Sequence, residues 1–308
     1  MPARRWTKLA ILHRTETTYG QTAAVVPADA IIATNVSFTP IEGDEVSRDL
    51  LLPYMGQQGV ILAGTYGRIE FDVEIAGAGA AGTAPKYGSL LRICGMAETT
   101  VAGTSVTYSI VESGVQSGTL HFNMDGVRHA LLGCFGTVTM SFAPKAIPHY
   151  RFTITGLLGT IDDAALPAVT MTGWTTPAAV SKANTTMTLH GWPSVAESLE
   201  LDLGNTVTPR HLIGDERIMI SDRKATGRAV VEATTLAQVD WFDRALKATR
   251  GALSLVHGKT PGNIVQVDCP AVQIGKPTQG QTDGLVNYTL PLSLCPVAGM
   301  DELTIVVK

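Results

Sequence analysis

The sequence predicts a mainly β protein built from two similar halves, each carrying one helix. Three observations lead to this prediction. Short segments of alternating apolar and polar residues follow one another, and 31 Gly and 16 Pro residues fall largely between them. Two segments alone show apolar residues at helical spacing. The same order of strand and helix patterns occurs twice along the chain.

The first half follows an N-terminal arm, residues 1–30, which is basic and then briefly apolar. Its apolar run ends at His13 and Arg14, too early for a secretory signal. A helix is predicted over 85–96, where Pro85 suits the first helical position. The apolar stripe of this helix consists of Tyr87, Leu90, Leu91 and Cys94. Strands are predicted at 31–39, 66–75, 106–112, 118–125, 127–142 and 147–156.

The second half follows residues 157–194, which are rich in Gly, Ala, Pro and Thr and have no sustained period. That composition predicts a linker lying along a surface. A second helix is predicted over 236–249, with Lys247 and Arg250 near its negative end. Its expected apolar stripe consists of Leu236, Val239, Phe242 and Leu246. Strands are predicted at 197–203, 216–221, 226–233, 252–257, 262–274, 284–294 and 302–308.

Matching landmarks relate the two halves. Arg48 precedes Arg68 by 20 residues, and Arg210 precedes Arg228 by 18 residues. The predicted helix follows the second arginine in both cases. We therefore expect one β domain, at 31–156, to be repeated once, at 195–308.

Charge and cysteine content exclude several classes of protein. The net charge of −4 and the 16% charged residues offer no basic surface for gripping nucleic acid or an anionic membrane. No apolar run approaches the ~18 residues of a membrane-spanning helix, so a protein made in a cytoplasm is expected. The cysteines lack the spacing of a disulfide framework or a zinc site, and we expect them to be reduced and unpaired. They are Cys94, Cys134, Cys269 and Cys295.

The stretch GAGAAG, Gly77 to Gly82, matches the pattern of a dinucleotide-binding loop. The strand before it carries Arg68, Glu70, Asp72 and Glu74, whereas the strand of such a site lies in a parallel sheet and is almost continuously apolar. Thr83 and Ala84 also separate Gly82 from Pro85, the first residue of the predicted helix, so the helix N-terminus would not meet a phosphate. A flexible loop with no cofactor is the favoured interpretation.

Glu70, Asp72 and Glu74 share one face of a predicted strand, with neighbours about 7 Å apart. That spacing is compatible with paired acid and base catalysis, so a hydrolase using Glu70 and Asp72 is one hypothesis. Alternation alone explains the pattern as a solvated strand face, which is favoured. The sequence contains no nucleophile elbow, zincin motif or Cys-x-x-Cys, so no catalytic or metal residues are assigned.

The segment from FTPIEGDEVSRDLLLPYMG through YGRIEFDVEIAG to SLLRICGM resembles the major tail (tail tube) proteins of long-tailed bacteriophages in their two-domain form. TETTYGQTAAVVPADAI, FNMDGVRHALLGCFGTVTMSF, ANTTMTLHG and DELTIVVK continue the likeness over nearly the whole chain. The resemblance implies two β-sandwich domains, each flanked by one helix. It also implies a structural virion protein with no catalytic site.

Several expectations about assembly follow from the resemblance. Three copies would form a ring with pseudo-six-fold symmetry, and rings would stack into a hollow tube in the virion tail, assembled in the cytoplasm of a bacterial host. Tape measure, tail terminator and distal tail proteins would be partners, and DNA would be passing cargo. A receptor-binding or carbohydrate-binding virion module is the alternative, although 6% aromatic residues offer few binding platforms.

Two sets of residues are singled out. The stretch 41–64 is expected to be a loop or hairpin that contacts the next ring, because an apolar cluster there would otherwise be exposed. Its candidates are Glu42, Asp44, Leu50, Leu51, Leu52, Tyr54 and Met55. A wall that does not hold DNA should be acidic or neutral. The candidates for the lumen of the tube are Glu70, Asp72, Glu74 and Glu232.

Overall fold

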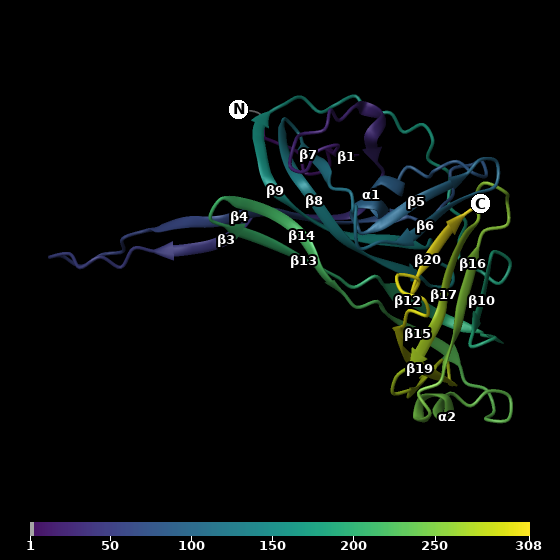
Figure 1. The fold of residues 1–308 in the computed structure, drawn as a ribbon. Helices are drawn as coiled ribbons and strands as arrows, with labels where there is room; N and C mark the ends of the chain where they lie inside the picture. Colours follow the sequence, from purple (N-terminus) through teal and green to yellow (C-terminus); the bar gives the residue numbers. More distant parts are fainter. Residues whose placement is uncertain (1–2) are drawn as a thin grey trace.

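The computed structural model describes residues 3–308, and strands dominate it (Figure 1). The first half contains β1 (Leu9–Thr15), β2 (Ala30–Ile31), β3 (Thr34–Ser47), β4 (Val60–Glu74), α1 (Gly88–Ile93), β5 (Met96–Val101), β6 (Ser105–Ile110), β7 (Gly118–Met124), β8 (Val127–Phe142) and β9 (His149–Asp163). The second half contains β10 (Thr185–Leu189), β11 (Trp192–Pro193), β12 (Ala196–Asp202), β13 (Asn205–Leu212), β14 (Asp215–Arg223), β15 (Thr226–Glu232), α2 (Trp241–Leu246), β16 (Arg250–His257), β17 (Val265–Ile274), β18 (Thr278–Thr282), β19 (Leu285–Leu294) and β20 (Thr304–Val307). The prediction of a mainly β fold is confirmed.

The two halves repeat the same strand pairings. Six antiparallel pairings of the first half have a counterpart in the second. In the first half they are β1·β2, β1·β7, β7·β8, β8·β9, β9·β4 and β4·β3. Their counterparts are β10·β11, β10·β16, β16·β17, β17·β19, β19·β15 and β15·β12. This topology provides a structural basis for the internal repeat.

Two pairings join the halves into continuous sheets. The end of β8 pairs with β12, so one run of neighbouring strands is β3, β4, β9, β8, β12, β15, β19 and β18. The strand β20 pairs with both β17 and β6, so a second run is β5, β6, β20, β17, β16, β10 and β11. Each run contains strands from both halves, which ties the halves together through main-chain hydrogen bonds.

The core explains the alternation of β4. Ile69, Phe71 and Val73 are buried on the inner face of this strand. They pair in register with Ile154, Phe152 and Tyr150 of β9, which are also fully buried. A strand whose side chains alternate in direction can thus place apolar residues against the core and polar residues on the other face.

The two helices are shorter than predicted. The α1 stripe is buried as expected, but the turn after Pro85 comes before the helix, with the Gly88 amide donating to the Pro85 carbonyl. The α2 helix begins after Asp240, whose carboxylate accepts from the Asp243 amide at 2.9 Å as an N-cap. Its buried anchor is Trp241, whereas two residues of the expected stripe, Leu236 and Leu246, are exposed.

The Gly77–Gly82 stretch is a loop that packs one half against the other. The Gly77 amide donates to the Asn263 side chain at 2.7 Å, and the Gly79 amide donates to the Gly262 carbonyl at 2.9 Å. A Cβ atom on Gly77 would lie 2.1 Å from the Gly262 oxygen, so glycine permits this backbone approach. The glycines therefore serve packing between the halves.

Several strands lie where the sequence predicted none. The strand β1 lies in the expected N-terminal arm, and β10 lies within the expected linker, 157–194. The strand β13 lies between the predicted strands 197–203 and 216–221, and it contains Pro209 in its interior. In addition, β9 continues to Asp163, past the expected limit of 156. These strands are short or irregular in pattern, and tertiary pairing determines their conformation more than local propensity.

Candidate assembly surfaces

A long arm projects from the first half. We define the arm as residues 41–64, the outer part of the β3–β4 hairpin (Figure 1). Within it, Glu42, Gln58 and Gly64 are partly covered, and every other residue is exposed. The strands extend to Ser47 and resume at Val60, so the predicted loop is a hairpin closed by a loop at 48–59.

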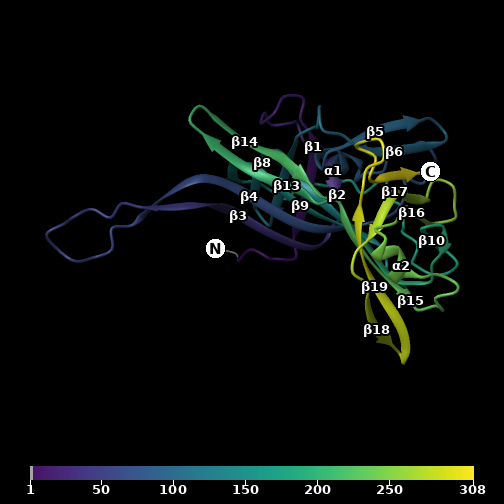
Figure 2. The same ribbon diagram turned by 60° about the horizontal axis from the view of Figure 1, so that its bottom comes forward.

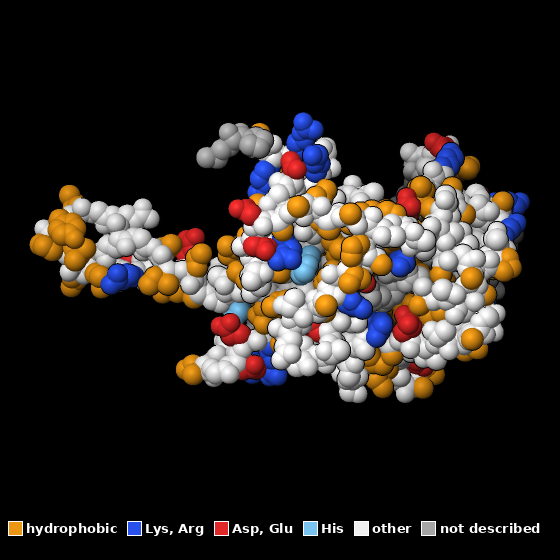
Figure 3. Space-filling view, turned by 90° about the horizontal axis from the view of Figure 1, so that it is seen from above, with side chains coloured by type: hydrophobic (Ala, Val, Ile, Leu, Met, Phe, Trp, Pro, Cys, Tyr) orange, Lys and Arg blue, Asp and Glu red, His pale blue; other side chains and the backbone are white. Residues whose placement is uncertain are grey.

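The tip of the arm is apolar. Leu51 and Met55 are exposed at 103% and 99%, and Tyr54 is exposed at 70%. Orange side chains gather at the far end of the arm in the space-filling view (Figure 3). The Gln58 side chain closes the loop by accepting from the Leu50 amide and donating to the Leu50 carbonyl. Covering such side chains stabilises a contact by about 1.5–3 kcal/mol each.

The polar candidates Glu42 and Asp44 lie nearer the body of the protein, on β3. Glu42 is opposite Tyr66 of β4, and Asp44 is opposite Ala63. The pKa of Tyr66 is raised, first by desolvation and second by the Glu42 carboxylate. These acids therefore belong to the stem of the arm, while Leu50, Leu51, Leu52, Tyr54 and Met55 form the apolar tip.

A second hairpin, β13–β14, lies beside the base of the arm (Figures 1 and 2). The rings of Tyr66 and His211 stack with centroids 6.4 Å apart. Tyr19 holds the other strand, because its hydroxyl donates to the Ile218 carbonyl at 3.2 Å and accepts from the Ile218 amide at 2.6 Å. At the turn of this hairpin, Ile213 is 109% exposed.

A polar face covers the long run of strands on the side opposite the core. One row of residues in register crosses seven strands and both halves, from Thr34 to Ser293. This row consists of Thr34, Asp72, Arg151, Thr139, Asp202, Thr226 and Ser293. A neighbouring row consists of Glu74, His149, Ser141, Glu200, Arg228 and Pro291. The face thus carries hydroxyl groups together with charged side chains of both signs, some of which are direct neighbours across strands.

Arg151 neutralises two of the four candidate carboxylates. Its guanidinium contacts Glu70 at 2.9 Å and Asp72 at 3.1 Å. The Glu70 hydrogen bond, followed by the Asp72 charge, raises the pKa of Arg151. Asp72 also accepts from the Asn35 amide group at 2.7 Å, and its side chain is only 6% exposed. The expectation that all the charged residues of this strand are solvated is therefore wrong for Asp72.

The other two candidates have different surroundings. Glu232 is exposed at the end of β15, opposite Asn287 of β19. Glu74 is partly covered and lines a hollow together with Met171 and Trp174 of the segment predicted to be a linker. Glu200 and Asp202, which the sequence reasoning did not select, lie on the same polar face as Glu232. Their alternation with buried Leu199 and Leu201 was the available signal.

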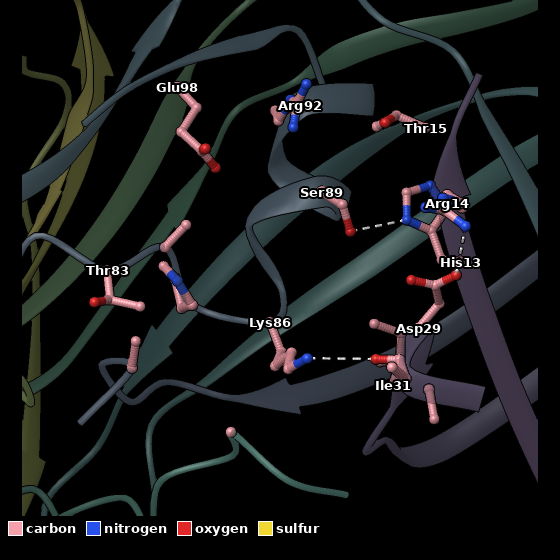
Figure 4. A pocket seen from close by; sticks show the side chains of 16 residues that line it. His13, Arg14, Thr15, Asp29, Ile31, Thr83, Lys86, Ser89, Arg92 and Glu98 are labelled. Atoms are coloured by element: carbon pink, nitrogen blue, oxygen red, sulfur yellow. Dashed lines mark hydrogen bonds and ion pairs between the residues drawn. The ribbon is translucent and has the colours of Figure 1, made fainter. Parts of the chain in front are cut away.

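A hollow of about 460 Å³ lies between β1 and α1 (Figure 4). His13 Nδ1 is 3.0 Å from Ser89 Oγ there, an arrangement resembling the nucleophile and base of a hydrolase. Burial, and then the nearby Arg92 charge, lower the pKa of His13 to about 3. A histidine with this pKa is a weak base near neutral pH, so the pair is poorly suited to nucleophilic catalysis.

Within residues 3–308, no three His, Cys, Asp or Glu side chains come together as a metal site. The same residues contain no helix long and apolar enough to cross a membrane. All four cysteines are free, and burial raises the pKa of Cys269 to about 12.

The duplicated β fold, the projecting arm and the polar sheet face define a structural assembly protein. The chain belongs to the phage tail tube protein family, whose profile matches residues 6–294. A comparison with curated proteins gives no match. The prediction of this family from the sequence is confirmed, and the chain is a structural component of a phage tail.

Proposed function

We propose that this chain is the repeating subunit of a tail tube and that three copies form each ring. The six pairings that recur in the two halves support this stoichiometry, because each chain then supplies two similar units to a pseudo-six-fold ring. Assembly takes place in the cytoplasm of the bacterial host. Tape measure, tail terminator and distal tail proteins are the expected partners.

The observation that carries the proposal is the apolar tip of the arm. Leu51 and Met55 lie far from the core of their own chain, and a monomer gains nothing from exposing them. An adjacent ring supplies the surface that buries them. The β13–β14 hairpin lies beside the base of the arm and supports it there, because His211 stacks on Tyr66.

Electron microscopy of the purified chain tests the stacking role. Leu51→Ser with Met55→Ser should leave rings intact and remove tubes longer than one or two rings. The matched control is Leu246→Ser, which also removes an exposed apolar side chain, but on α2. Tubes of normal length from the double variant would refute the role of the tip. Rings with six copies in a cryo-EM map would refute the trimer.

The polar face is the proposed wall of the DNA channel. By register, its charged residues are Arg68, Arg151 and Arg228 against Glu70, Asp72, Glu74, Glu200, Asp202 and Glu232. The carboxylates outnumber the arginines, so the face does not hold phosphates through counterion release. DNA can then pass without being retained.

Two exposed carboxylates allow a test of the channel. Glu200→Lys with Glu232→Lys should preserve the fold, because both side chains are exposed, and should slow genome ejection, more at low salt than at high salt. Asp72 is unsuited to this test, since a lysine there would be buried beside Arg151. Both variant side chains on the outer surface of the tube would refute the assignment.

A further inference from the structure

We propose that β18 of one copy pairs edge to edge with β3 of the next copy, and that this pairing closes the ring. The inference rests on the proposed function in one respect, that the partner is a second copy of the chain. Its basis is the junction between the halves, which serves as a template for the junction between chains.

The junction within the chain is a short antiparallel pairing. The end of β8 pairs with β12, with Met140 opposite Leu201 and Ser141 opposite Glu200. Main-chain hydrogen bonds thus connect the first half to the second. If the halves are equivalent units of a ring, the same pairing should connect the second half to the first half of the next copy.

The counterpart of β12 is β3. In the second half, β15 lies between β19 and β12. In the first half, β4 lies between β9 and β3 in the same way. Leu199 is opposite Ala229, and Phe38 is opposite Ile69. Ile69 and Ala229 directly follow the matching arginines Arg68 and Arg228, which sets the correspondence. On their other side, both are paired with buried residues, Ile154 and Leu290.

The counterpart of the end of β8 is β18. In the first half, β8 pairs with β9 along nearly its whole length. In the second half, β17 and then β18 pair with β19 in the same order. Ser141 is opposite His149, and Thr282 is opposite Leu285. His149 precedes Ile154 by the same interval as Leu285 precedes Leu290, so Thr282 corresponds to Ser141.

Both counterpart edges are unpaired within residues 3–308. The strand β3 pairs only with β4, and β18 pairs only with β19. Every residue of β18 is exposed, and its hairpin stands away from the body of the protein (Figure 2). An exposed strand edge presents unpaired amides and carbonyls, which favours pairing with another chain.

The template also sets the register. Glu200 is opposite Ser141 within the chain, so Thr39 of one copy should lie opposite Thr282 of the next. The two edges lie at opposite ends of the long run of strands, and the contact is heterologous. Heterologous contacts close when the rotation divides a full turn, and three copies satisfy this for a pseudo-six-fold ring.

Disulfide cross-linking of the full chain tests the pairing. Thr39→Cys and Thr282→Cys are combined in a Cys295→Ser background, because Cys295 is the least buried native cysteine. Residues directly opposite in antiparallel strands have Cβ atoms about 4.5–5.5 Å apart, within reach of oxidation or a short thiol cross-linker. The control pairs Thr39→Cys with Thr278→Cys, on the same strand but about 13 Å away.

The expected result is covalent dimers and trimers from the Thr39–Thr282 variant on a denaturing gel, at least tenfold more than from the control. Each single-cysteine variant should give no species beyond a dimer. Rings in the microscope without this cross-link, or equal cross-linking by the control, would overturn the pairing and leave the tail tube function intact. A chain that forms no rings at any concentration would overturn both proposals.

Discussion

The arm and the β13–β14 hairpin occupy corresponding places in the two halves, yet they end differently. The arm carries twelve residues between its strands, 48–59, with an apolar tip. The β13–β14 hairpin turns within Ile213 and Gly214. Both run in the same direction from the body of the protein (Figure 1). Duplication has thus allowed one hairpin to reach outward while its counterpart stays short and supports it.

The largest effect is expected when the loop of the arm is shortened to the length of its counterpart in the β13–β14 hairpin. Replacing residues 48–59 by a two-residue Asn-Gly turn should abolish tubes while leaving rings and the melting temperature nearly unchanged. The replaced residues lie outside the core, and Asn-Gly favours a tight hairpin. Electron microscopy and thermal unfolding measure the two effects. Tubes from this variant would show that the short hairpin suffices for stacking.

The two halves should differ in how much stability a buried histidine costs them at low pH. The folded-state pKa of His13 is about 3, below its unfolded value of 6.5, so the unfolded state binds more protons as pH falls. Stability is therefore lost below pH 6.5, by about 2 kcal/mol at pH 5. His13→Gln should remove this part of the slope in denaturant unfolding.

The second half provides the matched control for His13. Burial also lowers the pKa of His257, but its ring bonds Thr185 at 2.8 Å and the Ala178 carbonyl at 3.1 Å. His257→Gln should therefore change the acid slope less than His13→Gln. Equal slopes for both variants would contradict the assignment to His13.

Asp72 and Glu232 occupy corresponding positions in the two halves, but only Asp72 is buried and paired with a cation. Arg151→Met should destabilise the fold by about 2 kcal/mol, because Asp72 is left buried without its cation; the value is below that of a fully buried pair since Arg151 is 42% exposed. Glu232→Gln, at the exposed position, should cost under ~0.5 kcal/mol. Urea unfolding measures both, and similar losses would contradict the difference in burial.

A smaller loss than that of Arg151→Met is expected when the support of the arm is weakened. Tyr19→Phe removes the hydroxyl that bonds both the amide and the carbonyl of Ile218, at a cost of about 1 kcal/mol. Hydrogen exchange should increase in β14 and remain unchanged in β15. Unchanged exchange in β14 would show that the hairpin is held in other ways.

The strands that could be predicted from the sequence are those in which apolar and polar residues alternate because one face is buried. The β4 strand is one example, because Ile69, Phe71 and Val73 all enter the core. The α1 stripe is another. The apolar tip of the arm was also predictable, since Leu50 to Met55 stand outside any alternating segment.

Other features depend on contacts between residues distant in the chain. The burial of Asp72 requires Arg151 and Asn35, which lie on neighbouring strands and leave no local signal. The short α2 helix is anchored by Trp241, with the Arg244 guanidinium 5.0 Å from the ring centroid, and neither contact follows from helical periodicity. The β13 strand was missed because Pro209 argues against a strand interior, although an edge strand tolerates it.

The position of β20 has a consequence for the order of folding. Thr304–Val307 fill the space between β6 of the first half and β17 of the second, so the second run of strands stays open until they are made. Pairing between such distant segments is slow, because loop-closure entropy is lost before the contacts form. During translation, the nascent chain is therefore expected to complete the first run of strands through β8 and β12 but to leave the second run divided between β6 and β17 until β20 leaves the ribosome.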